Sequence, residues 1–404
     1  MRQLQKGRQN QSSETFNRPD PDNLSVLTLK FSFKIFLFFL LTFYLSPFTF
    51  PLAEAEEPIL VFPHPPGVTS TLLSARDFGI HPVREGVYNE IWTFEGYTDE
   101  GEIIRAAIGI SEAFPWGSTP VFSASLLKPD GTIQQFNLRS GQEEFRAAEE
   151  WLDLSIRQSS FRGPIGTGNK NTFQLKIQEK DFGLSLNLIC LSLGWQPPGE
   201  GRLIFGQGKK GFWDLAVLCP RTRFDGQVTT PAGPRPVKGW GYIDHTYSNI
   251  RILEFSRSWI SYRVHFLGFS LNFLEITATP KYGNRAIPLL ALVNDKETRL
   301  FPEVKVTKTD IVRDEKTGYD YPQVLRIEAR DGADRININL KVTNTTNRSD
   351  GLASLNTAER TFIKMFGIRP VGYTFANEAE IKLTLDGKTQ EFKSPSFHSL
   401  LIIN

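Results

Sequence analysis

The stretch KGWGYIDHTYSNI, from Lys238 to Ile250, gathers residue types that perform acid–base chemistry. Asp244 stands next to His245 in it, and the whole chain has only five histidines. Burial among aromatic side chains disfavours the charged form of an aspartate, so Asp244 could stay protonated near neutral pH. It could then act as a general acid, while His245 accepts a proton as a general base. These two residues are the candidate catalytic site.

Aromatic residues near this pair could stabilise a positive charge that develops beside them, because the face of an aromatic ring attracts a cation. The nearest in the sequence are Trp240, Tyr242, Tyr247 and Trp259. His265 is a second candidate base, although a histidine on the polar face of a strand is more often simply exposed.

The alternation of side chains along a strand limits what this stretch can do. If residues 240–249 form one strand, Asp244 and His245 point to opposite faces and cannot both enter one cavity. A β-bulge would aim both the same way, and a strand buried on both faces would give each a buried site. The alternative is an edge strand whose Asp-His pair bonds to a loop. The strand model divides the residues into Trp240, Tyr242 and Asp244 on one face and Gly241, His245, Tyr247 and Asn249 on the other.

Other functional classes find little support in the sequence. The glycine-rich stretches at 163–172 and 206–211 lack phosphate-loop spacing and read as turns, and no Gly-x-Ser-x-Gly or His-Glu-x-x-His motif occurs. Without residues 1–55, the 46 basic and 44 acidic residues become 40 of each, with no basic run. We therefore expect no nucleic-acid partner, no cofactor and no metal.

Cys190 and Cys219 are the only cysteines. An exported protein can oxidise such a pair to a disulfide, and two buried free thiols are the alternative.

Short alternating segments separated by Asp-Gly turns predict an all-β fold, a barrel or a sandwich. The only stretch of helical composition, residues 142–151, is brief. One hairpin can be placed in register: folding residues 258–276 about Leu267-Gly268 sets Val264 opposite Leu271 and Arg263 opposite Asn272. Such a ribbon has one apolar and one polar face and would separate two different environments. The alternating segments are residues 151–156, 172–177, 184–189, 323–329, 335–342 and 380–385.

The N-terminal 55 residues are typical of a signal peptide. An apolar run from Ile35 to Leu45 is followed by Ala53-Glu54-Ala55, an A-x-A cleavage pattern, which predicts a mature start at Glu56. An uncleaved anchor within residues 24–52 is the alternative. The lead before Lys34 is long, so translation could start downstream of Met1.

The motif GWGYIDHTYSN resembles the Gly-x-Gly-Tyr-x-Asp-His signature of the carotenoid 1,2-hydratase superfamily, which also contains kievitone hydratase and the AttH-like proteins. The flanking segments GKKGFWDLAVLCPRTRFDGQV and FLGFSLNFLEITATPKYG are similar to the related survival-factor-1 family. This resemblance implies two tandem lipocalin-like antiparallel β-barrels, or barrel-like sandwiches, with an apolar ligand in or between them. We place the domains at residues 56–232 and 233–404.

The resemblance assigns roles to few residues. Asp244 and His245 fall on the Asp-His that is thought to supply the acid and base of the hydratases. Tyr247 stands where the hydratases carry a tryptophan, and Glu275 falls near a downstream acidic position, without the neighbouring tyrosine. We count Glu275 with the ligand-binding candidates.

Three functions remain open at this stage. The first is an exported protein of the periplasm or cell envelope that hydrates or isomerises a double bond of an isoprenoid or lipid. The second is a carrier of such a ligand, and the third is an envelope structural protein without a ligand. Asp244→Asn should abolish turnover but not binding in the first case, and should be tolerated in the second. The oligomeric state stays open.

Overall fold

Antiparallel β-strands make up nearly all of the regular structure. The computed structural model describes residues 71–81, 87–112, 118–165, 171–198, 201–206, 211–352, 357–365 and 367–403. The predicted signal segment, residues 1–55, lies outside the described residues. Within these ranges no helix is both long and apolar enough to span a membrane.

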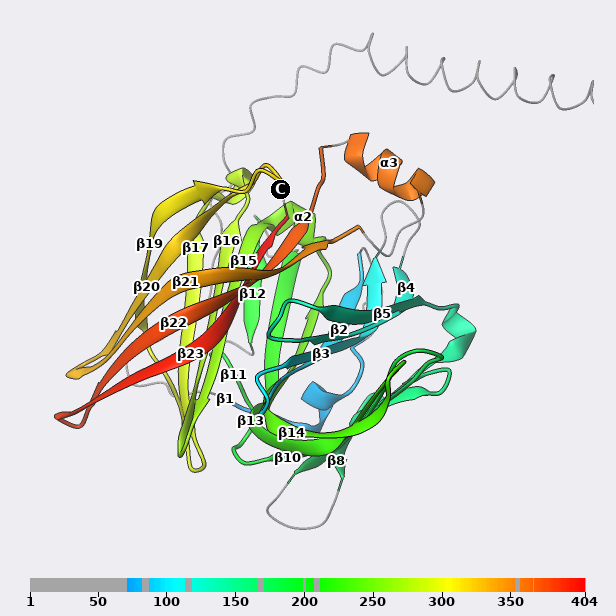
Figure 1. Ribbon diagram of the computed structural model, residues 1–404, viewed down its shortest axis with the longest axis horizontal. Helices are drawn as coiled ribbons and strands as arrows, with labels where there is room; N and C mark the ends of the chain where they lie inside the picture. Colours follow the sequence, from blue (N-terminus) through cyan, green and yellow to red (C-terminus); the bar gives the residue numbers. More distant parts are fainter. Residues whose placement is uncertain are drawn as a thin grey trace, which may run out of the picture. The chain divides into compact units, whose positions relative to one another are not determined.

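The first sheet has 14 strands, with the central order β5-β4-β3-β2-β14-β13-β10-β9-β8-β7-β6 (Figure 1). Its strands are β1 (Thr71–Leu72), β2 (Asn89–Thr98), β3 (Ile103–Glu112), β4 (Ser118–Leu127), β5 (Ile133–Arg139), β6 (Phe145–Ala147), β7 (Leu152–Ile156), β8 (Ser159–Ile165), β9 (Thr172–Gln178), β10 (Gly183–Cys190), β11 (Trp195–Gln196), β12 (Arg202–Phe205), β13 (Gly211–Thr230) and β14 (Gly233–Ser248).

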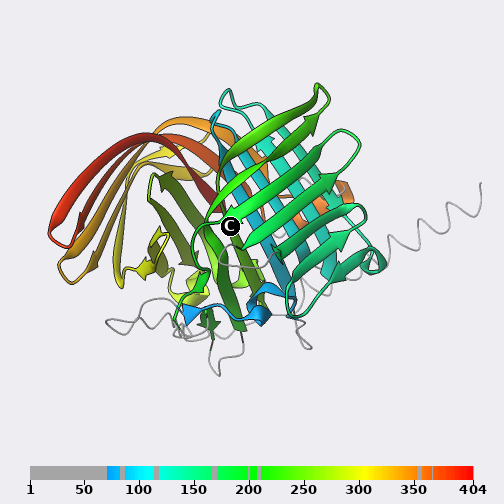
Figure 2. The same cartoon turned by 90° about the horizontal axis from the view of Figure 1, so that it is seen from below.

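The second sheet has nine strands in the order β18-β17-β16-β15-β23-β22-β21-β20-β19. They are β15 (Ser256–Phe266), β16 (Phe269–Ala278), β17 (Ala286–Asn294), β18 (Thr298–Leu300), β19 (Glu303–Arg313), β20 (Asp320–Asp331), β21 (Asp334–Asp350), β22 (Val371–Leu385) and β23 (Lys388–Ile402). Figure 2 shows the curvature of this sheet, whose strands are coloured from yellow-green to red. The helical segments are η1 (Ala75–Phe78), η2 (Gln142–Glu144), α2 (Ile252–Phe255), η3 (Pro280–Tyr282) and α3 (Thr357–Met365).

The predicted all-β, lipocalin-like fold is confirmed, with each sheet curved around a core of its own. The stretch of helical composition, residues 142–151, does not form an α-helix. Only Gln142–Glu144 form a 3₁₀ turn, and β6 follows at once, because Phe145 and Ala147 pack against the first core. The domain boundary expected between residues 232 and 233 falls in the β13–β14 turn, whereas the chain passes to the second sheet between Ser248 and Ser256.

The register of the β15–β16 hairpin agrees with the sequence-based prediction, including Val264 opposite Leu271 and Arg263 opposite Asn272. Val264 and Leu271 lie in the core of the second sheet. Arg263 and Asn272 line a cavity on the other side of the hairpin. The ribbon therefore separates an apolar core from a more polar space.

A third apolar cluster joins the two sheets. Trp195, Trp213 and Leu215 contribute to it from the first sheet, and Ile276 and Leu289 from the second. The sheets therefore pack through the faces that point away from their separate cores. This explains why every residue of β13 from 213 to 222 is buried, where ordinary alternation would expose every second one.

Cys190 and Cys219 form a disulfide, with their Cα atoms 5.7 Å apart. The bond joins the end of β10 to the middle of β13. The sequence left open whether these cysteines are free thiols or a disulfide, and the structure contains the disulfide.

Candidate functional site

A cavity of about 330 Å³ lies between the two sheets. Strand β14 contributes Tyr242, Asp244 and Thr246 to its wall, and β15 of the second sheet contributes Trp259, Ser261 and Arg263. In both strands these are alternate residues, as a strand with one face on a cavity requires. The cavity is therefore a space between the sheets, outside both of their cores.

The polar wall of the cavity is a network of two carboxylates and two guanidiniums. Arg263 donates to Glu95 over 3.0 Å and to Asp244 over 3.4 Å. Arg105 donates to the other oxygen of Glu95 over 2.7 Å. The same Arg105 reaches the second sheet, where it donates to the hydroxyls of Thr374 and Ser399. The network thus connects β2, β3 and β14 with β15, β22 and β23.

The two carboxyl groups of this network differ in their affinity for a proton. Burial raises the pKa of Asp244 above its ordinary value, against the opposing effect of Arg263. Burial alone would also raise the pKa of Glu95, but Arg263 and Arg105 outweigh it and hold that pKa well below its usual range. Of the two, Asp244 is the group that accepts a proton more readily, so it is the stronger candidate for acid chemistry.

The remaining wall of the cavity is aromatic and aliphatic. The guanidinium of Arg263 lies over the ring of Tyr242, 4.0 Å from its centroid, so the polar and aromatic walls meet there. Trp259 packs edge to face against Trp213, and its indole nitrogen donates to the hydroxyl of Ser256. Trp195 also lines this wall. The apolar part of a ligand would contact hydrophobic side chains here, as in most ligand pockets.

His245 lies on the opposite face of β14 from Asp244, as the alternation predicts. Its Nε2 lies 2.8 Å from Oε1 of Glu90, and its Nδ1 lies 2.8 Å from the backbone oxygen of Asp77. The ring stacks on Trp92 at 4.0 Å. A second cavity, of about 400 Å³, lies on this side of the strand and is lined by His81, His245 and Tyr247. Asp244 and His245 therefore each have a buried environment, but they line different cavities.

Glu90 receives several hydrogen bonds at the centre of this second group. Both of its oxygens accept from the backbone N–H of His81, and Oε1 also lies 3.0 Å from Nδ1 of that histidine. Tyr88 donates to Oε2. Burial alone would raise the pKa of Glu90, but the hydrogen bonds from His245 and His81 outweigh it and lower the pKa to about 2.

The other residues predicted from the sequence occupy different environments. Tyr242 and Trp259 line the cavity between the sheets, whereas Trp240 does not and lies instead under the guanidinium of Arg221. The hydroxyl of Tyr247 accepts a hydrogen bond from Arg202 beside the second cavity. Glu275 is buried in an ion pair with Lys308, outside the cavity wall.

His265, predicted to be exposed, is instead half-buried, and its Nδ1 lies 2.7 Å from the hydroxyl of Ser270. Burial, with a smaller effect of Arg221, lowers the pKa of His265 to about 3. It lines neither cavity.

Sequence reasoning missed the charged partners of the site. Glu95, Arg105 and Arg263 come from three strands, and no local pattern marks the first two. Arg263 had a signal, because the hairpin register placed it on the polar face of β15. Glu90 stands at one end of β2 and is 155 residues from His245.

The fold and the cavity between its sheets define a lipocalin-like all-β protein. Residues 90–400 match the model of the Svf1 family, and the chain belongs to that family. It is 21% identical over 322 residues to the ceramide-binding protein svf-1 of Neurospora crassa, an alignment that covers 75% of this chain and 81% of that protein.

Two solved structures share the fold. An AttH protein from Nitrosomonas europaea is 18% identical and superposes with a TM-score of 0.59, over 83% of this chain and 98% of that one. Kievitone hydratase from Nectria haematococca is 11% identical, with a TM-score of 0.53 over 86% of this chain and 99% of that one. At these identities the likeness concerns the fold alone.

Proposed function

We propose that this protein binds a lipid with an uncharged polar headgroup and holds it in the cavity between the two sheets. The observation that supports this most directly is that one cavity has both an aromatic wall and a polar wall of two carboxyl groups and two guanidiniums. Ceramide is the proposed ligand class, since it has an amide and two hydroxyls but no charge. The ceramide-binding relative in Neurospora crassa supports this choice.

The charge balance of the polar wall selects the headgroup. With Glu95 and Asp244 both ionised, they compensate the guanidiniums of Arg263 and Arg105. A phosphate or a fatty-acid carboxylate would enter as an uncompensated buried charge, which costs several kcal/mol. Hydroxyl and amide groups can instead both donate to the carboxylates and accept from the guanidiniums.

The size and composition of the cavity suit the part of the lipid next to the headgroup. A volume of about 330 Å³ lies at the lower end of the range for ligand pockets, about 300–1,000 Å³. The first carbons of the chains would contact Trp195, Trp213 and Trp259, where apolar surface is removed from water.

A competition between two matched lipids tests this proposal. The full chain is incubated with equal amounts of ceramide and ceramide 1-phosphate of the same chain length, repurified, and the bound lipid is measured by mass spectrometry. We expect ceramide to be preferred by more than about 10-fold, which corresponds to about 1.4 kcal/mol. Equal or stronger retention of the phosphate would contradict a neutral-headgroup site. Glu95→Gln, which removes one negative charge from the network, should shift the preference toward ceramide 1-phosphate.

Proton-driven chemistry on a carbon–carbon double bond is a second candidate. The observation in its favour is that Asp244, a buried carboxyl group, faces the same cavity as Tyr242 and Trp259. His245 lies on the other face of β14, so this chemistry would need another group to handle the water. In heavy water, deuterium gain on an unsaturated lipid by the wild type but not by Asp244→Asn would support the enzyme. Unchanged lipid retained by both proteins would support the carrier.

We also propose that the protein is exported to the cell envelope. The paired cysteines support it, because disulfides persist in oxidising compartments. N-terminal sequencing of the protein from its source cells tests it: a start at Glu56 would agree with signal cleavage, and an N-terminus upstream of residue 24 would favour the anchor.

A further inference from the structure

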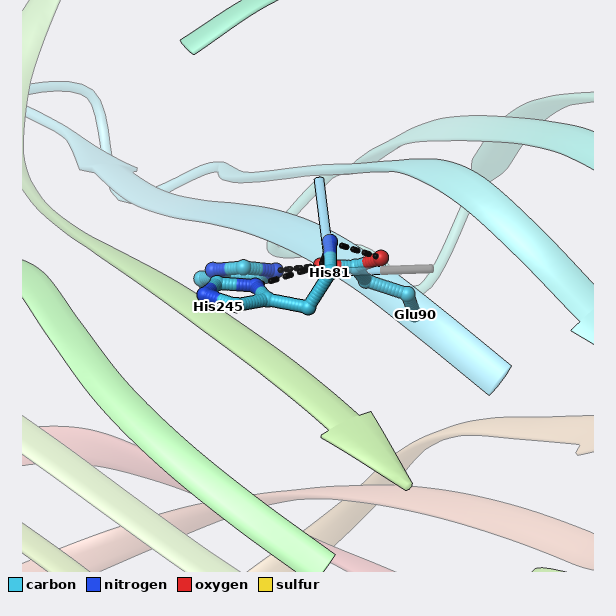
Figure 3. A group of neighbouring side chains, drawn as sticks. All are labelled: His81, Glu90 and His245. Carbon is cyan, nitrogen blue, oxygen red and sulfur yellow. Dashed lines mark hydrogen bonds and ion pairs between the residues drawn. The ribbon is translucent and has the colours of Figure 1, made fainter. Parts of the chain in front are cut away.

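One buried cluster lies outside the proposed lipid cavity. His81, Glu90 and His245 come from three separate parts of the chain: the segment after η1, strand β2 and strand β14 (Figure 3). Both imidazole rings direct a nitrogen at the same carboxylate. Glu90 and His245 are fully buried and His81 is nearly so. All three ligand atoms lie within 4.8 Å of one another.

The hydrogen bonds of His245 show that this cluster needs a proton or another cation between His245 and Glu90. Its Nδ1 lies 2.8 Å from the backbone oxygen of Asp77, which can only accept, so Nδ1 must bear a hydrogen. In the neutral ring Nε2 then has a lone pair, and this lone pair faces Oε1 of Glu90 at 2.8 Å. Two acceptors at that distance repel each other unless a proton or a metal ion lies between them.

We propose that His81, Glu90 and His245 bind a divalent metal ion of the Zn²⁺ class. Neutral imidazole and carboxylate are ligands that Zn²⁺ prefers, and three protein ligands of this kind leave one position open. The ion would bind Nε2 of His245, Nδ1 of His81 and Oε1 of Glu90. It would take the place of the proton otherwise needed between His245 and Glu90, and of the hydrogen bond between His81 and Glu90.

The surroundings of the cluster match those of metal ligands. A histidine that binds a metal usually donates its other ring N–H to a carbonyl or carboxylate, as His245 does to Asp77. The second oxygen of Glu90 accepts from Tyr88 and from the backbone N–H of His81. Oε1 shares that backbone N–H and has a further lone pair for the ion. Ring stacking on Trp92 and Tyr247 fixes the two imidazoles.

The three ligand atoms would have to shift to surround an ion. Bonds of about 2.0–2.2 Å at a tetrahedral ion separate neighbouring ligand atoms by about 3.3 Å. The nitrogens now lie 2.8 and 3.0 Å from Oε1 of Glu90, so each would move away from that oxygen by a few tenths of an ångström. The two nitrogens lie within 4.8 Å of each other and would approach by up to about 1.5 Å, which a rotation of the more exposed His81 side chain can supply. The second cavity, of about 400 Å³, borders His81 and His245, and it provides an entry path and space for a water on the ion.

Bound in this way, the ion would fasten the chain around His81 to β2 and β14. This site was not expected from the sequence, because no two of its ligands stand at a spacing typical of metal motifs. It is also independent of the lipid cavity, which lies on the other face of β14.

Titration with Co²⁺ and Zn²⁺ tests the site. The full chain, without an affinity tag, is stripped with a chelator and titrated. We expect one ion per chain, visible d–d bands of four-coordinate Co²⁺ that Zn²⁺ abolishes, and a higher melting temperature with metal. In His81→Gln, metal affinity should fall by more than about 100-fold. Loss of a residue that only hydrogen-bonds to a metal ligand costs about 10–100-fold. His265→Gln, a histidine outside the cluster, should bind like the wild type.

Two results would overturn the proposal. If the folded, chelator-treated wild type binds neither ion, the positive charge is a proton and the cluster is an imidazolium–carboxylate pair. If His81→Gln binds as tightly as the wild type, the ion is elsewhere. His81 is chosen because its side chain is the most exposed of the three, and melting curves recorded without metal show that each variant is folded.

Discussion

Arg263 of β15 donates to Glu95 of β2 over 3.0 Å and so joins the second sheet to the first. Both side chains are largely buried, and Asp244 is the second partner of the same guanidinium. One arginine therefore compensates two carboxylates at the wall of the proposed lipid site.

Arg263→Met should destabilise the protein strongly, because it leaves buried carboxylates without their main partner. We expect a loss of about 3–5 kcal/mol in the free energy of unfolding, measured with urea. Arg162→Met is the matched control, since Arg162 pairs with Asp153 on the exposed surface. Its loss should be below about 1 kcal/mol. Equal losses in the two variants would show that the network does not stabilise the contact between the sheets.

His398 should make the stability depend on pH. It is buried in β23, its Nδ1 lies 2.8 Å from Oδ1 of Asn377, and burial lowers its pKa to about 3. The unfolded chain, with an ordinary pKa of about 6.5, takes up the proton first as the pH falls. The stabilisation is therefore complete above about pH 6.5 and is lost progressively down to about pH 3.

The pH effect can be isolated by substitution. Between pH 7 and pH 5 the wild type should lose about 2 kcal/mol through this histidine. In His398→Asn, whose amide can still donate to Asn377, the dependence should be smaller by that amount. Because His265 also has a lowered pKa, the measured quantity is the difference in slope between the two proteins. Parallel slopes would contradict the assignment.

The Cys190–Cys219 disulfide should contribute to stability through the 29-residue separation that it closes. Loop-closure entropy gives about 3–4 kcal/mol for a loop of this length. Unfolding by urea with and without reductant measures it, and the Cys190→Ser/Cys219→Ser double variant should not respond to reductant. If the intact protein contains two free thiols by mass spectrometry, the bond does not form in its native compartment.

Local periodicity predicted part of this structure. The β15–β16 register and the division of β14 into two faces both follow from alternation, which depends only on neighbouring residues. The pairing of Asp244 with Arg263 was predictable only in part. The hairpin register placed Arg263 on the polar face of β15, but it did not identify Asp244 as its partner. That both faces of β14 are buried could not be decided, because it depends on packing between the sheets.

Long-range partners were beyond the reach of these patterns. Glu95 and Arg105 lie in strands far from β14 in the chain, and neither stands in a motif. The same holds for Glu90 and His81, which form the environment of His245. The sequence motif located the strand that both sites share, but not the charges that define their chemistry.

The most direct test of the account is whether the lipid occupies the cavity between the sheets. Thr246 is half-buried and lines that cavity, so Thr246→Phe would fill part of it. Thr229→Phe makes the same change at an exposed position of β13, outside the cavity. We predict that ceramide retention, measured by mass spectrometry after repurification, is lost in Thr246→Phe and unchanged in Thr229→Phe. Equal retention of ceramide by the wild type and by folded Thr246→Phe would contradict the assignment of this cavity as the lipid site.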